Sequence, residues 1–330
     1  MWLEKTYLSF IIGFVRPFFD VDSFWGNILI GDYGILTMTP IFLFGLLLPL
    51  VAGFYFLRHL LVDSCIMPRI AKCLDRPLRR IGLSGNSILP LTLGFGCVTV
   101  ALVSAGTLGT KRERLIASVL LSIAVPCSAQ VAVIFALSFL LDWNYMLLYF
   151  GIVLAVFYLL GFLLNLLLPG KIPSISLETP SLRMPDLGKI IKKTAREAVD
   201  FLQDAGPTFF LGSIAISLLD YYDGFMKLRE WFAPITSGFL NLPENATNLF
   251  ILSIIKRDLG AAGFYSMVNN GSFTQPEILV TLIVLTLFVP CFASQMILFK
   301  EQKAVTAILI WIGSFLLSFF VGGITSLFLL

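Results

Sequence analysis

Pro126-Cys127-Ser128-Ala129 lies in the middle of an apolar run that is long enough to cross a lipid bilayer. A proline inside a helix removes a backbone hydrogen bond and breaks or kinks the helix. The tract Pro290-Cys291-Phe292-Ala293 repeats this arrangement 164 residues later (290 minus 126), about half of the 330-residue chain. We therefore interpret the two tracts as one element used twice, a broken membrane helix with a cysteine beside the break.

The composition is typical of an integral membrane protein. Hydrophobic residues make up 58% of the chain, charged residues make up 13%, and the mean hydropathy is +0.92. Soluble domains carry about 45–50% apolar and about 25% charged residues. Sustained apolar runs predict membrane-crossing segments. These runs are Gly34–Leu61, Leu115–Leu141, Tyr145–Leu168, Ala205–Leu219, Pro276–Phe299 and Ala304–Leu329.

Two further apolar stretches contain glycine and proline and are not simple spans. Basic segments flank Leu83–Leu108 on both sides, and basic loops tend to stay in the cytoplasm. We therefore expect this stretch to enter and leave the membrane on one face, as a re-entrant hairpin. Irregular backbone is tolerated at membrane depth where protein buries it or where it lines a watery cavity. A second re-entrant element is expected at Trp231–Ile255, open to the opposite face.

The predicted fold class is an all-α integral membrane protein, a polytopic helical bundle with two inverted repeats, re-entrant hairpins and proline-broken helices. With the basic loops in the cytoplasm, the two proline–cysteine helices run in opposite directions. This arrangement is common among secondary transporters, whose binding site lies at the repeat interface. The expected parts are an N-terminal interfacial or membrane-associated segment (1–33), a first repeat (34–168), a basic cytoplasmic linker (169–196) and a second repeat (197–330).

Three cysteines beside predicted helix breaks form the candidate metal site, namely Cys97, Cys127 and Cys291. A thiolate next to exposed backbone carbonyls suits a transition metal such as Fe²⁺ or Zn²⁺ better than Na⁺ or Mg²⁺. Gly94 and Gly96 favour exposed carbonyls because glycine lets the backbone approach closely. The alternative is that each cysteine is a small buried apolar residue.

Two aspartates and several polar residues extend the candidate site. Asp63 and Asp258 lie in or beside apolar segments, where ionisable groups are costly and usually functional. The alternative for Asp63 is an interfacial position in which it pairs with Arg58 or Arg69. The alternative for Asp258, next to Arg257, is that it only caps a half-helix. Gln130 and Gln295 either supply oxygen ligands or bond one helix to another. The residues that we place on the substrate path are Gly94, Gly96, Pro126, Ser128, Pro290 and Ser294.

The sequence excludes several other classes of site. His59 is the only histidine, so a histidine-based metal centre cannot form. A nucleotide-binding loop of the Gly-x-x-x-x-Gly-Lys-Ser/Thr type does not occur. No hydrolase pattern occurs either, so we expect a protein that is not an enzyme, with no intrinsic cofactor and no nucleic-acid partner. The five cysteines are odd in number and lie in or beside apolar segments, which argues against a disulfide framework.

Several blocks of the sequence occur in the order of one known family. They are Gly31–Met38, Asp63–Arg69, Gly82–Cys97, Thr107–Arg114, Pro126–Ala129, Ala205–Pro207, Arg257–Gly263 and Val289–Cys291. In these blocks the chain resembles the membrane domain of ferrous iron transport protein B, the FeoB family. The resemblance implies Gate-type repeats related to nucleoside transporters, Fe²⁺ as the transported substrate, and cysteines on the iron path. We expect the chain to lack the GTP-binding domain with which the family begins.

The chain departs from the family pattern at a few positions. The family favours Glu, Lys or Arg, Pro and Arg at the places occupied here by Val62, Asn86, Val100 and Gly106. These departures remove polar, charged or rigid residues from the matching blocks. The identity of the metal therefore stays open. The energy coupling also stays open between the membrane potential, protons and a partner GTPase.

The sequence predicts a transporter that moves ferrous iron, or a similar divalent metal, into the cytoplasm through a midplane site between two inverted repeats. We expect a multi-pass protein of a bacterial or archaeal plasma (inner) membrane. Its expected partners are membrane lipid, a separate GTPase or small cytoplasmic accessory protein of the Feo system, and further copies of the chain. Two alternatives stay open: a nucleoside or small-solute carrier of related fold, and a non-transporting membrane scaffold or sensor.

Overall fold

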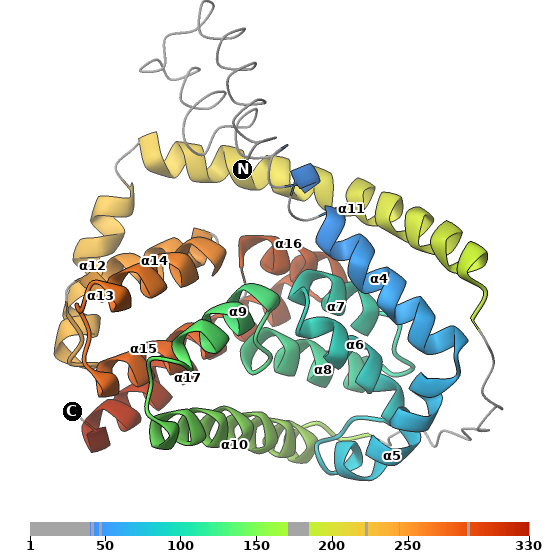
Figure 1. The fold of residues 1–330 in the computed structure, drawn as a ribbon, viewed down its shortest axis with the longest axis horizontal. Helices are drawn as coiled ribbons and strands as arrows, with labels where there is room; N and C mark the ends of the chain where they lie inside the picture. Colours follow the sequence, from blue (N-terminus) through green and yellow to red (C-terminus); the bar gives the residue numbers. More distant parts are fainter. Residues whose placement is uncertain are drawn as a thin grey trace, which may run out of the picture. The chain divides into compact units, whose positions relative to one another are not determined.

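The computed structural model of the chain describes residues 40, 43–45, 48–170, 185–221, 224–243, 245–255, 257–288 and 291–329. The chain divides into two compact units, each formed from two separate segments (Figure 1). Unit 1 comprises Met1–Ser64 and Arg183–Leu228, and unit 2 comprises Cys65–Leu182 and Arg229–Leu330. All the regular elements of the described residues are helices.

Unit 1 is built on α4 (Leu48–Asp63) and α11 (Leu187–Tyr221), which lie against each other. Polar side chains lie between the two helices: the Glu197 carboxylate lies 3.0 Å from the Arg58 guanidinium and 3.3 Å from the His59 imidazole. α11 is 35 residues long and begins within the segment expected to be a linker. The basic stretch before the predicted span is therefore helical from Leu187 onward.

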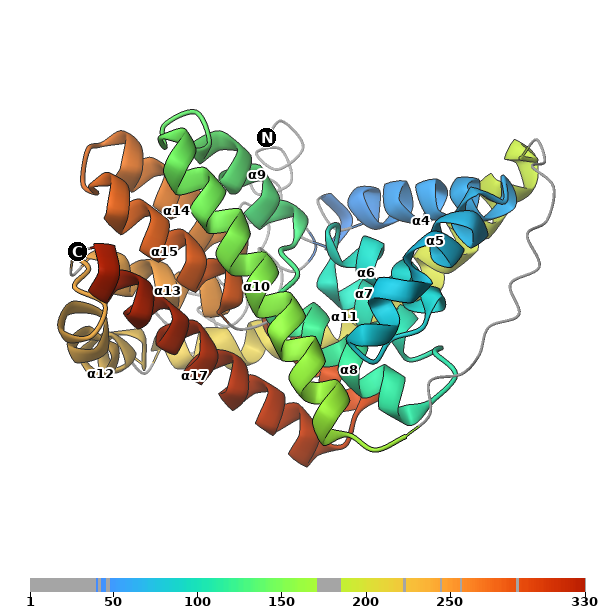
Figure 2. The ribbon, with the colours of Figure 1, turned by 90° about the horizontal axis from the view of Figure 1, so that it is seen from below.

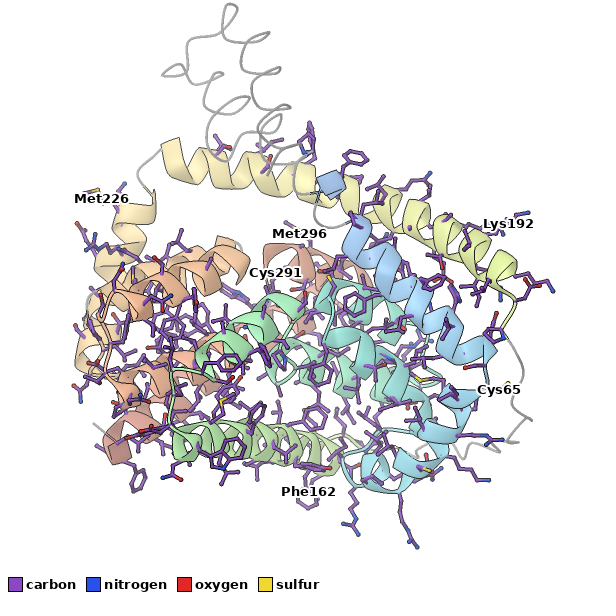
Figure 3. All side chains as sticks on the ribbon, in the orientation of Figure 1. Cys65, Phe162, Lys192, Met226, Cys291 and Met296 are labelled. Carbon is purple, nitrogen blue, oxygen red and sulfur yellow. The ribbon has the colours of Figure 1, made fainter. Side chains whose placement is uncertain are left out.

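Within the described residues, four helical segments are long and apolar enough to cross a membrane, and each overlaps a predicted span. They are Leu43–Asp63, Lys111–Leu137, Trp143–Leu167 and Ala304–Leu329. The helix α10 (Trp143–Leu167) exposes large apolar side chains, and Figure 3 shows Phe162 pointing away from the protein. Lipid chains can solvate such a surface, whereas water cannot do so favourably. The prediction of an all-α membrane protein is confirmed.

The core of unit 2 is formed around α15 (Gln275–Leu287), in which all residues from Ile278 to Leu287 are buried. Figure 2 shows α15 lying between α10 and α17 (Ala304–Leu329), and it packs against both. The second half of α8 (Lys111–Ile123) is buried in the same way. A helix that is apolar all around fits only in the interior of a bundle or of a membrane.

Both proline–cysteine tracts break a helix, as predicted. α8 ends at Ile123, and α9 (Ser128–Leu137) begins directly after Cys127. α15 ends at Leu287, and α16 (Phe292–Glu301) begins directly after Cys291. Cys127 has an extended backbone at the N-terminus of its helix, so the chain changes direction there. Pro290 lies outside the described residues.

A helical hairpin precedes each break. The first contains η2 (Gly85–Ser87), α6 (Ile88–Gly94) and α7 (Val98–Ala105), with α6 and α7 packed together. It lies within the stretch Leu83–Leu108 that was predicted to form a hairpin. The second hairpin pairs α13 (Asn245–Ile255) with α14 (Arg257–Asn269) (Figure 1).

The predicted boundaries of the second hairpin, Trp231–Ile255, are wrong. Pro234 lies inside the separate helix α12 (Gly224–Gly238), so the proline and glycine of this stretch do not mark a hairpin tip. The second arm is α14, which starts at Arg257 and thus contains the charged block that the prediction placed outside the hairpin.

We predict that Gly322→Ala destabilises the packing of α17 on α15. A Cβ atom at Gly322 would lie well inside van der Waals distance of Val284 and 3.0 Å from Leu240 Cδ2. Val284 is fully buried and cannot move aside, and overpacking of this kind costs about 1–3 kcal/mol.

Thermal unfolding in detergent measures this effect. Gly313→Ala, on the same helix, is the control because its new Cβ would meet nothing within 4 Å. A lower Tm is expected for Gly322→Ala alone, and equal Tm values for the two variants would contradict the packing of α15 on α17.

Candidate functional site

The three candidate cysteines all occupy the same kind of position in the fold. Cys97 is the N-cap of α7, Cys127 is the N-cap of α9, and Cys291, labelled in Figure 3, is the N-cap of α16. The first backbone N–H groups of a helix have no partner within the helix and favour negative charge. Each sulfur is free and partly buried at such a helix end.

The first hairpin and the first helix break are bonded directly to each other. The N–H of Ser128 donates to the carbonyl oxygen of Gly96 at the hairpin tip over 3.1 Å. The tip is closed by the N–H groups of Gly96 and Cys97, which both donate to the carbonyl of Leu93. Cys97 and Cys127 are therefore brought together, since each adjoins one partner of the Gly96–Ser128 bond.

The second break approaches the same hairpin. α16 packs against α7, and Cys291 lies within electrostatic range of Cys97. The buried hydroxyl of Ser294 donates to the Cys291 carbonyl over 2.8 Å and lies 3.4 Å from the Cys291 sulfur. In the same way, α9, which follows the first break, packs against α14 of the second hairpin. The three cysteines are thus gathered around the tip of the first hairpin.

The two glutamines after the cysteines differ in their bonding. Gln130 accepts a hydrogen bond from the N–H of Cys127 over 3.1 Å and donates to the carbonyl of Leu285 over 2.6 Å. It therefore bonds the first break to the end of α15, as one of the two sequence interpretations expects. Gln295 is 8% exposed, and neither its amide nitrogen nor its amide oxygen has a hydrogen-bond partner among the described residues.

A buried glutamate holds the base of the first hairpin. Glu113 is 2% exposed, and its carboxylate accepts hydrogen bonds from the backbone N–H of Ser84 and from the hydroxyl of Ser87, each over 2.8 Å. The Ser84 hydroxyl donates to the same oxygen. Glu113 is not among the candidate site residues that the sequence predicts. Its neighbours Lys111, Arg112 and Arg114 are charged, and this charge run is typical of a solvated helix end.

Not every candidate residue joins the cysteines. Asp63 belongs to unit 1, where its carboxylate lies 3.7 Å from the Lys193 ammonium. Asp258 is part of α14, but its side chain is outside what the structure describes. Among the described residues, no three His, Cys, Asp or Glu side chains lie close enough together to hold a metal ion. An open apolar groove of about 550 Å³ runs along α10 and contains none of the cysteines.

The structure describes the surroundings of two positions that depart from the FeoB pattern, Val100 and Gly106. Val100 is 2% exposed in α7, where it contributes to the apolar packing of the hairpin. A Cβ atom at Gly106 would first meet the Glu301 carboxylate, the flexible end of a side chain on α16. The position of Gly106 is thus a contact between the first hairpin and the helix that follows the second break.

The region that contains both hairpins and both breaks matches a known family. The Gate family model, described as nucleoside recognition, matches residues 44–138 and 202–305. The chain belongs to the Gate family. The matched ranges contain all three candidate cysteines.

Several curated relatives of this Gate protein are named as iron transporters. It is 32% identical over 232 residues to the Fe(2+) transport protein A/Fe(2+) transporter FeoB fusion protein of Porphyromonas gingivalis, covering 67% of this chain and 26% of that protein. It is 32% identical over 201 residues to the Fe(2+) transporter FeoB of Legionella pneumophila, covering 59% of this chain and 25% of that protein. It is 26% identical over 286 residues to the Fe(2+) transporter FeoB of Staphylococcus aureus, covering 77% of this chain and 42% of that protein.

These matches confirm the resemblance to FeoB. The chain spans between 25% and 42% of the length of these relatives.

Solved structures of CNTnw share the fold. The outward-facing state of a doubly substituted CNTnw variant has a TM-score of 0.52 at 14% sequence identity, covering 98% of this chain and 83% of that chain. An inward-facing substrate-bound state has a TM-score of 0.51 at 15% identity, and the match again covers 98% of this chain and 83% of the other. At this level of identity the likeness shows the fold alone.

We predict that Glu113→Ala loosens the first hairpin. The substitution leaves the buried N–H of Ser84 and the hydroxyls of Ser84 and Ser87 without their acceptor, and each unpaired buried group costs about 1–3 kcal/mol. Glu230→Ala is the control because Glu230 is exposed on α12. Hydrogen exchange at residues 84–94 should accelerate in Glu113→Ala only, and unchanged protection there would contradict the role of Glu113.

Proposed function

We propose that the chain is a membrane transporter that moves Fe²⁺, or a similar divalent metal, along a path between the hairpins and helix breaks of unit 2. The observation that carries this proposal is the gathering of three cysteine N-caps around the tip of the first hairpin. Thiolate sulfur is a ligand that favours transition metals over Na⁺ and Mg²⁺. The similarity to Fe(2+) transporters supports iron as the transported metal.

In this proposal the two halves, residues 34–168 and 197–330, are inverted repeats of the Gate type. Each half contributes a hairpin followed by a broken helix. The helix after each break packs against the second arm of the other half's hairpin: α9 on α14 and α16 on α7. Such reciprocal packing supports a site at the interface of the repeats, at the middle of the membrane.

The path needs no preformed metal cage. A conducted ion must bind strongly enough to enter and weakly enough to leave. Cys97, Cys127 and Cys291 supply soft ligands in turn, and the hydroxyls of Ser128 and Ser294 supply oxygen beside them. Asp63 and Asp258 remain candidates for charge-compensating or entrance groups, as the sequence predicts.

The membrane potential can supply the energy for inward transport. Two positive charges that move down 100 mV release about 4.6 kcal/mol, which supports a concentration ratio of about a thousandfold. A bacterial plasma membrane provides such a potential with the inside negative. A relative that is fused to Fe(2+) transport protein A supports a small accessory protein of that kind as a partner.

We predict that the triple variant C97S/C127S/C291S loses metal transport. A serine hydroxyl is a hard ligand, so the substitutions preserve size but weaken binding of a transition metal. The measurement is radioactive Fe²⁺ flux into proteoliposomes under an imposed potential, and the expected loss is at least about tenfold, or 1.4 kcal/mol in the binding and transport barrier. Cys73→Ser is the control because Cys73 is exposed on α5 (Ile66–Arg80).

Flux that is unchanged in the triple variant would reject the three cysteines as ligands. A nucleoside carrier is the second candidate, since the family is described as nucleoside recognition. Uptake of uridine by the same proteoliposomes, in the absence of metal flux, would favour that function. A protein that carries neither would be a membrane scaffold or sensor.

We further predict that replacement by leucine changes the stability of the protein in opposite directions at Gln295 and Gln130. Gln295→Leu removes a buried amide that has no partner among the described residues, so it should stabilise the protein by about 1 kcal/mol. Gln130→Leu removes two hydrogen bonds and should destabilise it by about 1–3 kcal/mol.

If Gln295 serves the moving ion, Gln295→Leu also reduces Fe²⁺ flux although the protein becomes more stable. Thermal unfolding and flux are measured on the same preparations. A Gln295→Leu protein that is more stable and transports at the normal rate would remove Gln295 from the path without affecting the cysteines.

A further inference from the structure

Helix α5 presents three different faces around its axis. Its buried face carries Met67, Ala71 and Leu78. The next face carries an apolar row at four-residue spacing, in which Ile66, Ile70 and Leu74 are 38%, 38% and 37% exposed. Residues four apart lie on one side of a helix, so this row is continuous.

The remaining exposed face of α5 is basic. Its charged residues are Arg69, Lys72, Arg76 and Arg80, each exposed, together with the half-buried Arg79. The acidic residue of the helix is Asp75, and its carboxylate is already engaged by the Arg79 guanidinium at 2.6 Å and by the backbone N–H of Gly85 at 2.8 Å. Within the described part of the chain, Arg69, Lys72 and Arg76 make no ion pair.

The length and charge of α5 exclude a transmembrane position. Its 15 residues extend about 22 Å, less than the hydrocarbon thickness of about 30 Å. The exposed apolar row also makes full immersion in water unfavourable. A helix with an apolar side and a row of Lys and Arg is typical of the membrane interface, where its axis lies in the membrane plane.

The helix is also firmly attached to the first hairpin. The Asp75–Gly85 hydrogen bond joins the two, and a Cβ atom at Gly85 would collide with the backbone carbonyl of Ala71. At its C-terminus, the Asn165 amide donates to the carbonyl of Arg80 over 3.1 Å. The middle and the C-terminal end of α5 are thus tied to protein, while its apolar row and its basic face remain exposed.

We propose that α5 is an interfacial helix that binds anionic phospholipid headgroups through Arg69, Lys72 and Arg76, with Ile66, Ile70 and Leu74 inserted among the acyl chains. Cys65, labelled in Figure 3, marks where the helix begins. The basic groups without an ion pair are available to anions from outside the described part of the chain, and the apolar row beside them favours contact with a hydrocarbon phase. Anionic lipid supplies both in one molecule. The proposal is independent of which solute the protein carries.

A fluorophore on Cys73 tests this proposal in the full chain. Cys73 is the exposed cysteine of α5 and lies between the basic face and the apolar row. The protein is reconstituted in equal mixtures of phosphatidylglycerol and phosphatidylcholine, with one or the other lipid brominated so that it quenches the fluorophore. Each basic side chain near a membrane surface contributes roughly fivefold in affinity for anionic lipid. We expect a preference for the anionic lipid of roughly tenfold or more.

Two variants and two controls define the outcome. R69Q/K72Q/R76Q should abolish the lipid preference while quenching persists, and I70S/L74S should reduce quenching by both lipids. K189Q/K192Q/R196Q, which removes the same charge from α11, should change neither, and a Cys73→Ser sample reports labelling at other cysteines. Equal quenching by the two lipids in the wild type, or a preference that survives R69Q/K72Q/R76Q, overturns the proposal. An equal loss in K189Q/K192Q/R196Q would also overturn it, because net charge would then account for the preference.

Discussion

A helix that is broken inside an apolar bundle releases backbone groups that neither water nor lipid can satisfy there. In unit 2 these groups are satisfied by bonds between separate elements. The N–H of Ser128 at the first break donates to Gly96 at the hairpin tip, and the Gln130 amide donates to the Leu285 carbonyl near the end of α15. These bonds therefore connect separate elements of the bundle. The elements that these bonds connect are the ones that carry the cysteines.

The hairpin is hydrogen-bonded to its surroundings at its base as well as at its tip. The Glu113 carboxylate collects three donors from Ser84 and Ser87 at the base, while Gly94, which has no side chain, lets α6 approach Leu121 of α8 closely. Because a buried carboxylate is costly without donors, the position of the base is specific. The location of Cys97 thus follows from polar bonds at both ends of the hairpin, and apolar packing fills the space between them.

The sequence predicted the features that depend on local chemistry. Proline next to cysteine predicts both breaks, glycine-rich sequence between basic segments predicts the first hairpin, and apolar length predicts the spans. The predictions from sequence were wrong or incomplete where tertiary contacts determine the conformation or burial of a residue. Pro234 looked like a hairpin signal but lies within a helix, and Glu113 looked like part of a solvated charge run although its carboxylate is buried. Whether such groups are buried or paired depends on contacts with residues that are distant in the sequence. A local sequence pattern does not indicate these contacts.

The glutamines of the two breaks differ in how fully their amide groups are hydrogen-bonded, and this difference bears on the proposed transport. At the first break, both amide atoms of Gln130 are bonded. At the second, Ser294 bonds within its own turn, and the Gln295 amide has no partner in the described residues. The glutamine of the first break is thus committed to the scaffold, whereas the glutamine of the second break has polar atoms that it can offer to an ion or its hydration water. The proposed transport is consistent with such uncommitted groups, because a complete cage would not release its ion.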